Sequence, residues 1–133
     1  MNGPLKRTAQ VWWANQQPFF SKVTRPLSVA LSDTNELVGV CGFFNNTPTK
    51  EWEAWLLLRS KFWGKGIGTE VISALVEVAF DSLVAHCVIA IVDPENHASL
   101  NMLKKLNFVF VREYSDTSSW QSGHLIYGME RHM

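Results

Sequence analysis

Apolar and polar positions along this chain follow two repeating patterns, and the first is the short apolar or alternating run that is typical of β-strands. A turn-forming stretch, Ser32 to Glu36, separates the first two runs and indicates a hairpin. The run Cys87 to Val92 is almost wholly apolar and rich in β-branched residues, as expected of a central strand covered on both faces. The predicted strands are residues 27–31, 37–44, 51–58, 87–92, 108–114 and 125–129.

The second pattern is the helical one, in which apolar residues recur three and four positions apart. A long helix is predicted after the glycine-rich segment at 64–68, and its apolar stripe is Ile72, Leu75, Val76, Ala79, Phe80 and Leu83. A second helix follows the turn Asp93 to Asn96, with Ser99, Met102, Leu103 and Leu106 on one face. Asn107 suits the end of that helix. A weaker helix-like pattern covers Leu5 to Val23 and is broken at Pro18.

The order of these elements is helix, three strands, helix, strand, helix and two strands. This order predicts an α/β domain with a mixed sheet rather than a helical bundle or a β-sandwich. A chain of 133 residues has room for one such domain, so we expect a single domain over residues 1–133 with one site.

Composition excludes several classes of function. Hydrophobic residues make up 47% and charged residues 18%, which is typical of a globular protein, and the 12 basic and 12 acidic residues balance. We therefore expect no nucleic acid partner. No run of about twenty apolar residues could cross a bilayer, so we expect a cytoplasmic protein with no membrane partner.

Cysteine and histidine positions indicate no metal site. Cys41 and Cys87 lie inside apolar runs, which favours buried free thiols. The four histidines lack the spacing of metal ligands, so we expect no metal. They are His86, His97, His124 and His132.

The segment WGKGIGTE, from Trp63 to Glu70, carries the strongest chemical signal. Gly64, Gly66 and Gly68 precede a helix N-terminus, where backbone N–H groups and the helix dipole favour an anion. The pattern therefore predicts a phosphate or pyrophosphate site, with a plain connecting turn as the alternative.

Two familiar phosphate motifs do not fit this spacing. A Walker motif places Ser or Thr after its lysine, whereas Lys65 is followed by Gly66. The dinucleotide fingerprint has two residues between its second and third glycines, whereas only Ile67 separates Gly66 from Gly68.

The segment instead resembles the pyrophosphate-binding signature of GNAT acetyltransferases, in which a glycine, any residue and a glycine or alanine open a long helix after a strand. The run FWGKGIGTEVISALVEVAF is similar to the branch that acetylates ribosomal-protein N-termini, which usually reads YWGKGYATEA here. DPENHASLNMLKKLNFVFVREY is similar to that branch's next block. The resemblance covers Pro26 to Arg131.

The resemblance implies a mixed, mostly antiparallel sheet flanked by helices, with a splayed central pair of strands. In the family, the fourth strand carries a bulge, and the pantetheine arm of acetyl-CoA pairs with the open edge of that strand. The corresponding edge of this chain is Trp55 to Arg59. The resemblance also assigns main-chain N–H groups to the pyrophosphate, with Lys65 adding charge or remaining solvated. The acetyl-CoA-binding residues that it implies are Leu57, Leu58, Arg59, Trp63, Gly64, Lys65, Gly66, Ile67, Gly68, Thr69, Asn96 and Ser99.

The resemblance implies two catalytic groups. Glu53 aligns with a glutamate that accepts the amine proton directly or through water, and an outward-facing strand residue is the alternative. Many members carry a tyrosine four residues after the Ser99 position to protonate the leaving thiolate. Leu103 stands there, which leaves Ser99 or water as the acid. Tyr114 and His124 are candidates for the acceptor end of the site.

The sequence departs from the family at its start, where a first strand is apparently missing, and Asn107 replaces a glycine. Helices in that region usually line the acceptor pocket. The predicted function is therefore acetyl transfer from acetyl-CoA to a primary amine, either a protein N-terminus or a small amine. The alternative is a shortened domain that binds CoA or another protein. A homodimer is possible under either reading.

Overall fold

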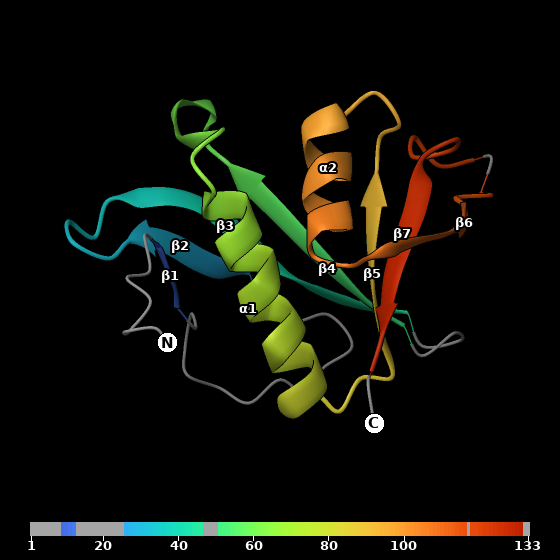
Figure 1. Cartoon of the computed structure of the whole chain (residues 1–133), viewed down its shortest axis with the longest axis horizontal. Coiled ribbons are helices and arrows are strands. Elements are labelled where there is room, and N and C mark those ends of the chain that lie inside the picture. Colours follow the sequence, from blue (N-terminus) through green and yellow to red (C-terminus); the bar gives the residue numbers. More distant parts are fainter. Residues whose placement is uncertain (1–8, 13–25, 47–50, 117, 132–133) are drawn as a thin grey trace.

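The structure is a computed structural model, and it describes residues 9–12, 26–46, 51–116 and 118–131. Seven strands of this described part form one sheet in the order β1-β2-β3-β4-β5-β7-β6 (Figure 1). All neighbouring strands are antiparallel except β4 and β5. The strands are β1 (Ala9–Trp12), β2 (Leu27–Leu31), β3 (Leu37–Asn46), β4 (Glu51–Leu58), β5 (Cys87–Val92), β6 (Val109–Glu113) and β7 (Leu125–Glu130). The predicted mixed, mostly antiparallel α/β fold is confirmed.

The first strand corrects one prediction. A helix-like pattern covers Leu5 to Val23, but within it Ala9–Trp12 form β1, which pairs antiparallel with β2. The other residues of that range lie outside the described part. The first strand, which the sequence analysis finds missing at the start of the chain, is therefore present as β1 before the β2–β3 hairpin. Hydrogen bonding to the edge of β2 outweighs the weak local helical preference.

The remaining predicted elements are present with small changes at their ends. β2 and β3 form the predicted hairpin, and β4 covers the predicted residues. The long helix is α1 (Ile67–Asp81), and the second helix is α2 (His97–Lys105). Both helices form where the sequence predicts them, because each buries its apolar stripe against the sheet.

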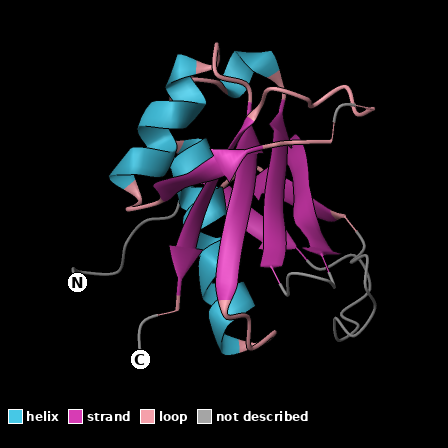
Figure 2. Cartoon of the chain, turned by 90° about the vertical axis from the view of Figure 1, so that its right-hand side faces the viewer, coloured by secondary structure: helices cyan, strands magenta, loops and turns pink. Residues whose placement is uncertain are grey.

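Both helices lie on one face of the sheet, as Figure 1 and the turned view in Figure 2 show. The core between the helices and the sheet includes Val71 and Leu75 of α1 and Leu103 of α2. Ala54 of β4 is buried in it, and Leu56 and Leu58 pack against it. Because side chains alternate along a strand, Glu53, Trp55 and Leu57 point to the opposite face.

β4 and β5 separate after a short parallel ladder. Only Glu51 to Glu53 pair with Cys87 to Ile89, and β4 continues to Leu58 without β5 beside it. The β3–β4 register runs without a shift, so the bulge that the family resemblance implies is not visible in that ladder. The predicted splay is therefore present without such a register shift.

Two non-glycine residues near helix ends adopt the left-handed conformation. Asn107 has φ 72°, as its place at the end of α2 predicts. Val84 has φ 53° just after α1, where the Ala85 N–H donates to the Ala79 carbonyl oxygen at 2.9 Å. A β-branched residue is strained there, because its Cβ approaches the backbone.

Replacing Val84 with glycine should stabilise the protein. Val84 is 66% exposed, so Val84→Gly removes strain with little loss of packing. We expect the free energy of unfolding to rise by about 1 kcal/mol, after allowance for the flexibility of glycine in the unfolded chain. Urea unfolding measures the change. Val109, which is 64% exposed on β6, supplies the control, because Val109→Gly should destabilise the strand by about 0.5–1 kcal/mol. Equal losses for both variants would contradict strain at Val84.

Candidate functional site

The open edge of β4 supplies unpaired backbone groups. The Arg59 N–H donates to the Val38 carbonyl oxygen at 2.9 Å, so Arg59 faces β3. Backbone N–H and C=O groups alternate in direction along a strand, so those of Leu57 also point to β3. The backbone groups of Leu56 and Leu58 point instead to the gap beside β5. The indole N–H of Trp63 already donates to the Leu58 carbonyl oxygen at 2.9 Å. The Leu56 backbone groups and the Leu58 N–H therefore remain for a ligand.

The start of α1 supplies a second set of donors. Gly66 is the N-cap residue with φ 81°, and no side chain caps the helix. The Glu70 N–H is the first to bond within the helix, to the Gly66 carbonyl oxygen. The N–H groups of Ile67, Gly68 and Thr69 precede it and have no partner within the helix. This uncapped turn suits an anion, because the helix dipole adds positive potential there.

Asn96 caps α2 in the ordinary way. Its side-chain oxygen accepts from the Ser99 N–H at 3.1 Å, which is the usual role of an Asn placed just before a helix. The second helix thus lacks the free first turn that α1 has, although Asn96 and Ser99 both line the cavities described next.

The first cavity, of about 440 Å³, lies between β4, the glycine-rich loop and the first turns of both helices. Its lining includes most residues predicted to bind acetyl-CoA: Leu57, Leu58, Trp63, Gly64, Gly66, Gly68, Thr69, Asn96 and Ser99. Leu56, inside the predicted edge Trp55 to Arg59, lines it as well, and three further lining residues were not predicted: Phe62, Ala98 and Met102. The helical periodicity places Met102 one turn after Ser99 on the same face, and this signal could have identified it.

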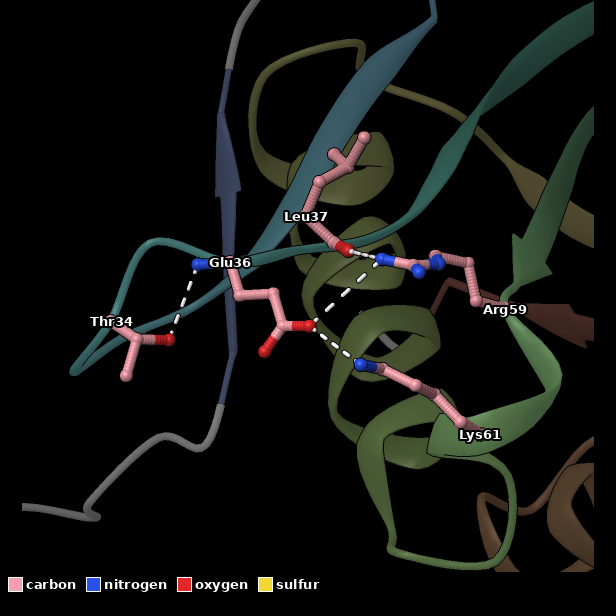
Figure 3. A network of polar contacts seen from close by, with 5 residues as sticks. All are labelled: Thr34, Glu36, Leu37, Arg59 and Lys61. Carbon is pink, nitrogen blue, oxygen red and sulfur yellow. Dashed lines mark hydrogen bonds and ion pairs between the residues drawn. The ribbon is translucent and has the colours of Figure 1, made fainter.

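Three residues predicted to bind acetyl-CoA do not line this cavity. Arg59 turns to the β2–β3 hairpin, where its guanidinium donates to the Leu37 carbonyl oxygen at 3.0 Å (Figure 3). Ile67 is 1% exposed, so only its backbone is available. Lys65, the third, lies in the glycine-rich loop outside the lining.

The hairpin contact of Arg59 has an electrostatic cause. Glu36 in the hairpin forms an ion pair with Lys61 at 2.8 Å and lies 4.0 Å from the Arg59 guanidinium (Figure 3). The hydrogen bond from Lys61 and the two positive charges lower the pKa of the Glu36 carboxyl. Arg59 and Lys61 thus interact with the hairpin, and neither residue lines the cavity.

A second cavity, of about 620 Å³, shares Leu56, Leu57, Asn96, Ser99 and Met102 with the first. Its lining comes from both faces of the sheet. Ala54, Ile72 and Leu103 belong to the helix side, whereas Glu53 and Trp55 point to the opposite side. The gap between β4 and β5 therefore opens through the sheet and joins the two sides.

Glu53 stands where the β4–β5 ladder ends, opposite Ile89, and its side chain lines the second cavity. Burial raises the pKa of its carboxyl above the usual range. A carboxyl with a raised pKa is a better proton acceptor than an exposed one. His124 also lines this cavity, whereas Tyr114 does not.

Three aromatic residues line the same cavity as Glu53, and of these only Trp55 belongs to the predicted edge of β4. Phe44 of β3 is paired in register with Glu53 of β4. Its ring stacks on that of Trp55, with ring centroids 5.8 Å apart and an interplanar angle of 23°. Gly42 pairs with Trp55, and a Cβ at Gly42 would lie 2.9 Å from the indole ring, so this position requires glycine. Strand alternation and the hairpin register could have identified Phe44 and Trp55. Trp120, in the loop before β7, offered no periodic signal.

Two further findings concern the described residues. Neither α1 nor α2 is long and apolar enough to cross a membrane. The same part of the chain holds no group of three or more His, Cys, Asp or Glu side chains arranged to hold a metal ion.

Comparisons with known proteins agree with this geometry. The family model of the acetyltransferase (GNAT) domain matches residues 4–109. An uncharacterized N-acetyltransferase p20 from Bacillus licheniformis is 33% identical over 82 residues, which are 61% of this chain and 46% of that protein. The chain thus spans about half the length of this curated relative.

Two solved structures share the fold. Ribosomal-protein-S5-alanine acetyltransferase from Vibrio fischeri has a TM-score of 0.64 at 19% identity, over 79% of this chain and 60% of that chain. Campylobacter jejuni N-acetyltransferase PseH in complex with acetyl coenzyme A has a TM-score of 0.62 at 21% identity, over 80% and 69%. The match to the family model includes the glycine-rich loop, the open edge of β4 and α2, and the chain belongs to the GNAT acetyltransferase family.

Proposed function

We propose that this chain transfers an acetyl group from acetyl-CoA to a primary amine by direct attack. The observation that carries the proposal is the opening through the sheet. Uncapped helix N–H groups stand at one end of it and the half-buried carboxyl of Glu53 at the other. The name of the Bacillus licheniformis relative and the acetyl-CoA complex of PseH support the same reaction class.

The residues present suit acetyl-CoA. The N–H groups of Ile67, Gly68 and Thr69 would hold its pyrophosphate, because they are unpaired within α1 and lie at the positive end of the helix. The backbone groups of Leu56 and the N–H of Leu58 would pair with the amides of the pantetheine arm along the open edge of β4. This assignment replaces the backbone groups of Leu57, which face β3, and the Arg59 N–H, which bonds to the Val38 carbonyl oxygen.

The reaction requires a neutral amine. A carboxylate at Glu53 takes one proton from the ammonium group, and the freed nitrogen lone pair then attacks the thioester carbonyl carbon. The carbon–sulfur bond breaks as the amide bond forms, the nitrogen loses a second proton, and the thiolate takes up one proton. The products are the N-acetylated amine, CoA and one released proton.

Ser99 is the proposed donor of the proton to the thiolate. It lines both cavities and is half-buried, whereas Leu103 stands where many relatives carry a tyrosine and has no proton to give. Water is the alternative donor. Either group would act from the helix side, opposite to Glu53.

The second candidate function is a module that binds CoA or another protein without turnover. Binding without acetyl transfer to any amine would support this candidate. The cytoplasmic location and the homodimer stay predictions.

Filling the first cavity should prevent acetyl-CoA binding. Gly68 is a helical residue whose added Cβ would point at Met102, with the sulfur 3.3 Å away, and at Leu56. We expect Gly68→Met to weaken acetyl-CoA binding by about tenfold or more, because the side chain would occupy the space of the ligand. Isothermal titration measures the affinity. Glu77→Met, on an exposed position of α1, adds the same side chain away from the cavity and should bind normally. Equal affinity of the two variants would contradict the cofactor assignment.

The pH profile of turnover should depend on Glu53. Because its pKa is raised, kcat/KM should increase with pH through a pKa above the ordinary glutamate value as the carboxyl loses its proton. Glu53→Gln should remove that step and lower kcat/KM by about 100-fold or more. Thiol release measured from acidic to alkaline pH tests both effects. An unchanged acidic limb in the variant would exclude Glu53 as the base.

The same carboxyl should lower stability at neutral pH. A raised pKa in the folded state means that the folded protein holds the proton more tightly than the unfolded chain. The contribution of Glu53 to the free energy of unfolding is therefore greatest below the unfolded pKa of 4.5, and it is lost as pH rises through the folded pKa. We expect Glu53→Gln to be more stable than the wild type at pH 7 and about equally stable at pH 4. Urea midpoints at the two pH values measure this, and equal midpoints at pH 7 would argue against burial of the charge.

A further inference from the structure

The second cavity has an aromatic lining that the proposed reaction does not need. Phe44 comes from β3, Trp55 from β4 and Trp120 from the loop between β6 and β7. Transfer of an acetyl group needs only a neutral amine and a base, so these rings must serve another purpose or pack only with one another. Their contacts separate the two possibilities.

Phe44 and Trp55 stack on each other beside the proposed base. Their rings stack at 5.8 Å with an angle of 23°, and Phe44 is 44% exposed. Register places Phe44 directly opposite Glu53, and Trp55 follows two positions along the same face. An aromatic surface thus adjoins the carboxyl that would bind the amine.

Trp120 lies on the same cavity with little cover from the described residues. It is 82% exposed, and its ring contacts His124 edge to face at 5.5 Å. Hydrogen bonds within the loop, including His124 N–H to the Gln121 carbonyl oxygen at 2.8 Å, hold this segment. A large ring held at the rim of a cavity offers apolar area that a ligand can cover.

The charges around the cavity are of one sign. Glu53 and Asp93 line it, and the described lining contains no lysine or arginine. Arg112, on β6, is held by Glu51 at 2.8 Å instead. Such a lining attracts an ammonium group and repels a carboxylate or phosphate near it.

We propose that the acceptor is a primary amine joined by a short alkyl chain to an aromatic ring, with no anionic group next to the amine. The proposal rests on the proposed function and specifies its substrate class. The ammonium group pairs with Glu53, the ring packs against the exposed part of Phe44, and Trp120 covers the ring from the rim. A cavity of about 620 Å³ has room for an amine of one or two rings.

Three probes separate the features of this class. 2-Phenylethylamine has both the ring and the amine, 2-cyclohexylethylamine keeps the size without aromaticity, and phenylalanine adds a carboxylate beside the amine. Isothermal titration of the whole chain, alone and saturated with CoA, measures binding without turnover. We expect 2-phenylethylamine to bind about fivefold more tightly than the cyclohexyl amine. We expect phenylalanine to bind at least about tenfold more weakly than 2-phenylethylamine.

Variants at exposed aromatic residues test the ring contact. Trp120→Ala should remove most of the preference for the aromatic over the cyclohexyl amine, and Trp120→Phe should restore it. Phe110 is exposed on β6 outside both cavities, so Phe110→Ala is the matched control and should leave the preference unchanged.

Two outcomes would overturn the proposal. One is equal or tighter binding of the cyclohexyl amine or phenylalanine, and the other is no binding of any amine by a folded chain that binds CoA. A separate titration with acetyl-CoA tests the proposed function, since loss of that binding would count against the acetyltransferase itself. Normal acetyl-CoA binding with a preference for aliphatic amines or for peptides with a free N-terminus would reject the substrate class alone.

Discussion

The short parallel ladder between β4 and β5 is the constraint on which the site depends. Three residues of each strand pair, and the ladder ends at Glu53. Beyond that point β4 remains attached to β3, so the backbone groups of Leu56 and Leu58 face a gap. A longer ladder would satisfy these groups within the protein and close the opening. The same separation brings Glu53 and Ser99, from opposite sides of the sheet, to one cavity.

The glycine-rich loop completes this arrangement because it leaves α1 uncapped. Most helices satisfy part of their first turn with a side chain, as Asn96 does for α2. Gly66 has no side chain to do so, and its left-handed conformation turns the chain sharply into the helix. The unpaired N–H groups then lie at one end of the gap, while the cations Arg59 and Lys61 are drawn to Glu36. Backbone donors rather than side-chain charges thus dominate that end.

Periodicity in the sequence predicted the strands from Leu27 onward and both helices, because these features depend on local patterns, whereas the resemblance to the GNAT family supplied most residues of the first cavity. β4 and the capping by Asn96 are examples. The pattern failed at Ala9–Trp12, where pairing with β2 determines the structure. The resemblance placed Arg59 on the open edge of β4, whereas its N–H bonds to Val38 and its side chain lies near Glu36, both distant in sequence. The position of Trp120 at the second cavity could not be predicted, because a polar loop has no periodic pattern that indicates which residues its side chains contact.

Amide hydrogen exchange with and without acetyl-CoA tests the central claim most directly, because the claim concerns individual N–H groups. The account predicts slower exchange at Leu56, Leu58, Gly68 and Thr69 when acetyl-CoA is added. It predicts no comparable change at Arg59, whose N–H already bonds to Val38. Protection confined to other segments, or none at saturating acetyl-CoA, would contradict the claim that the gap beside β4 and the first turn of α1 hold the ligand.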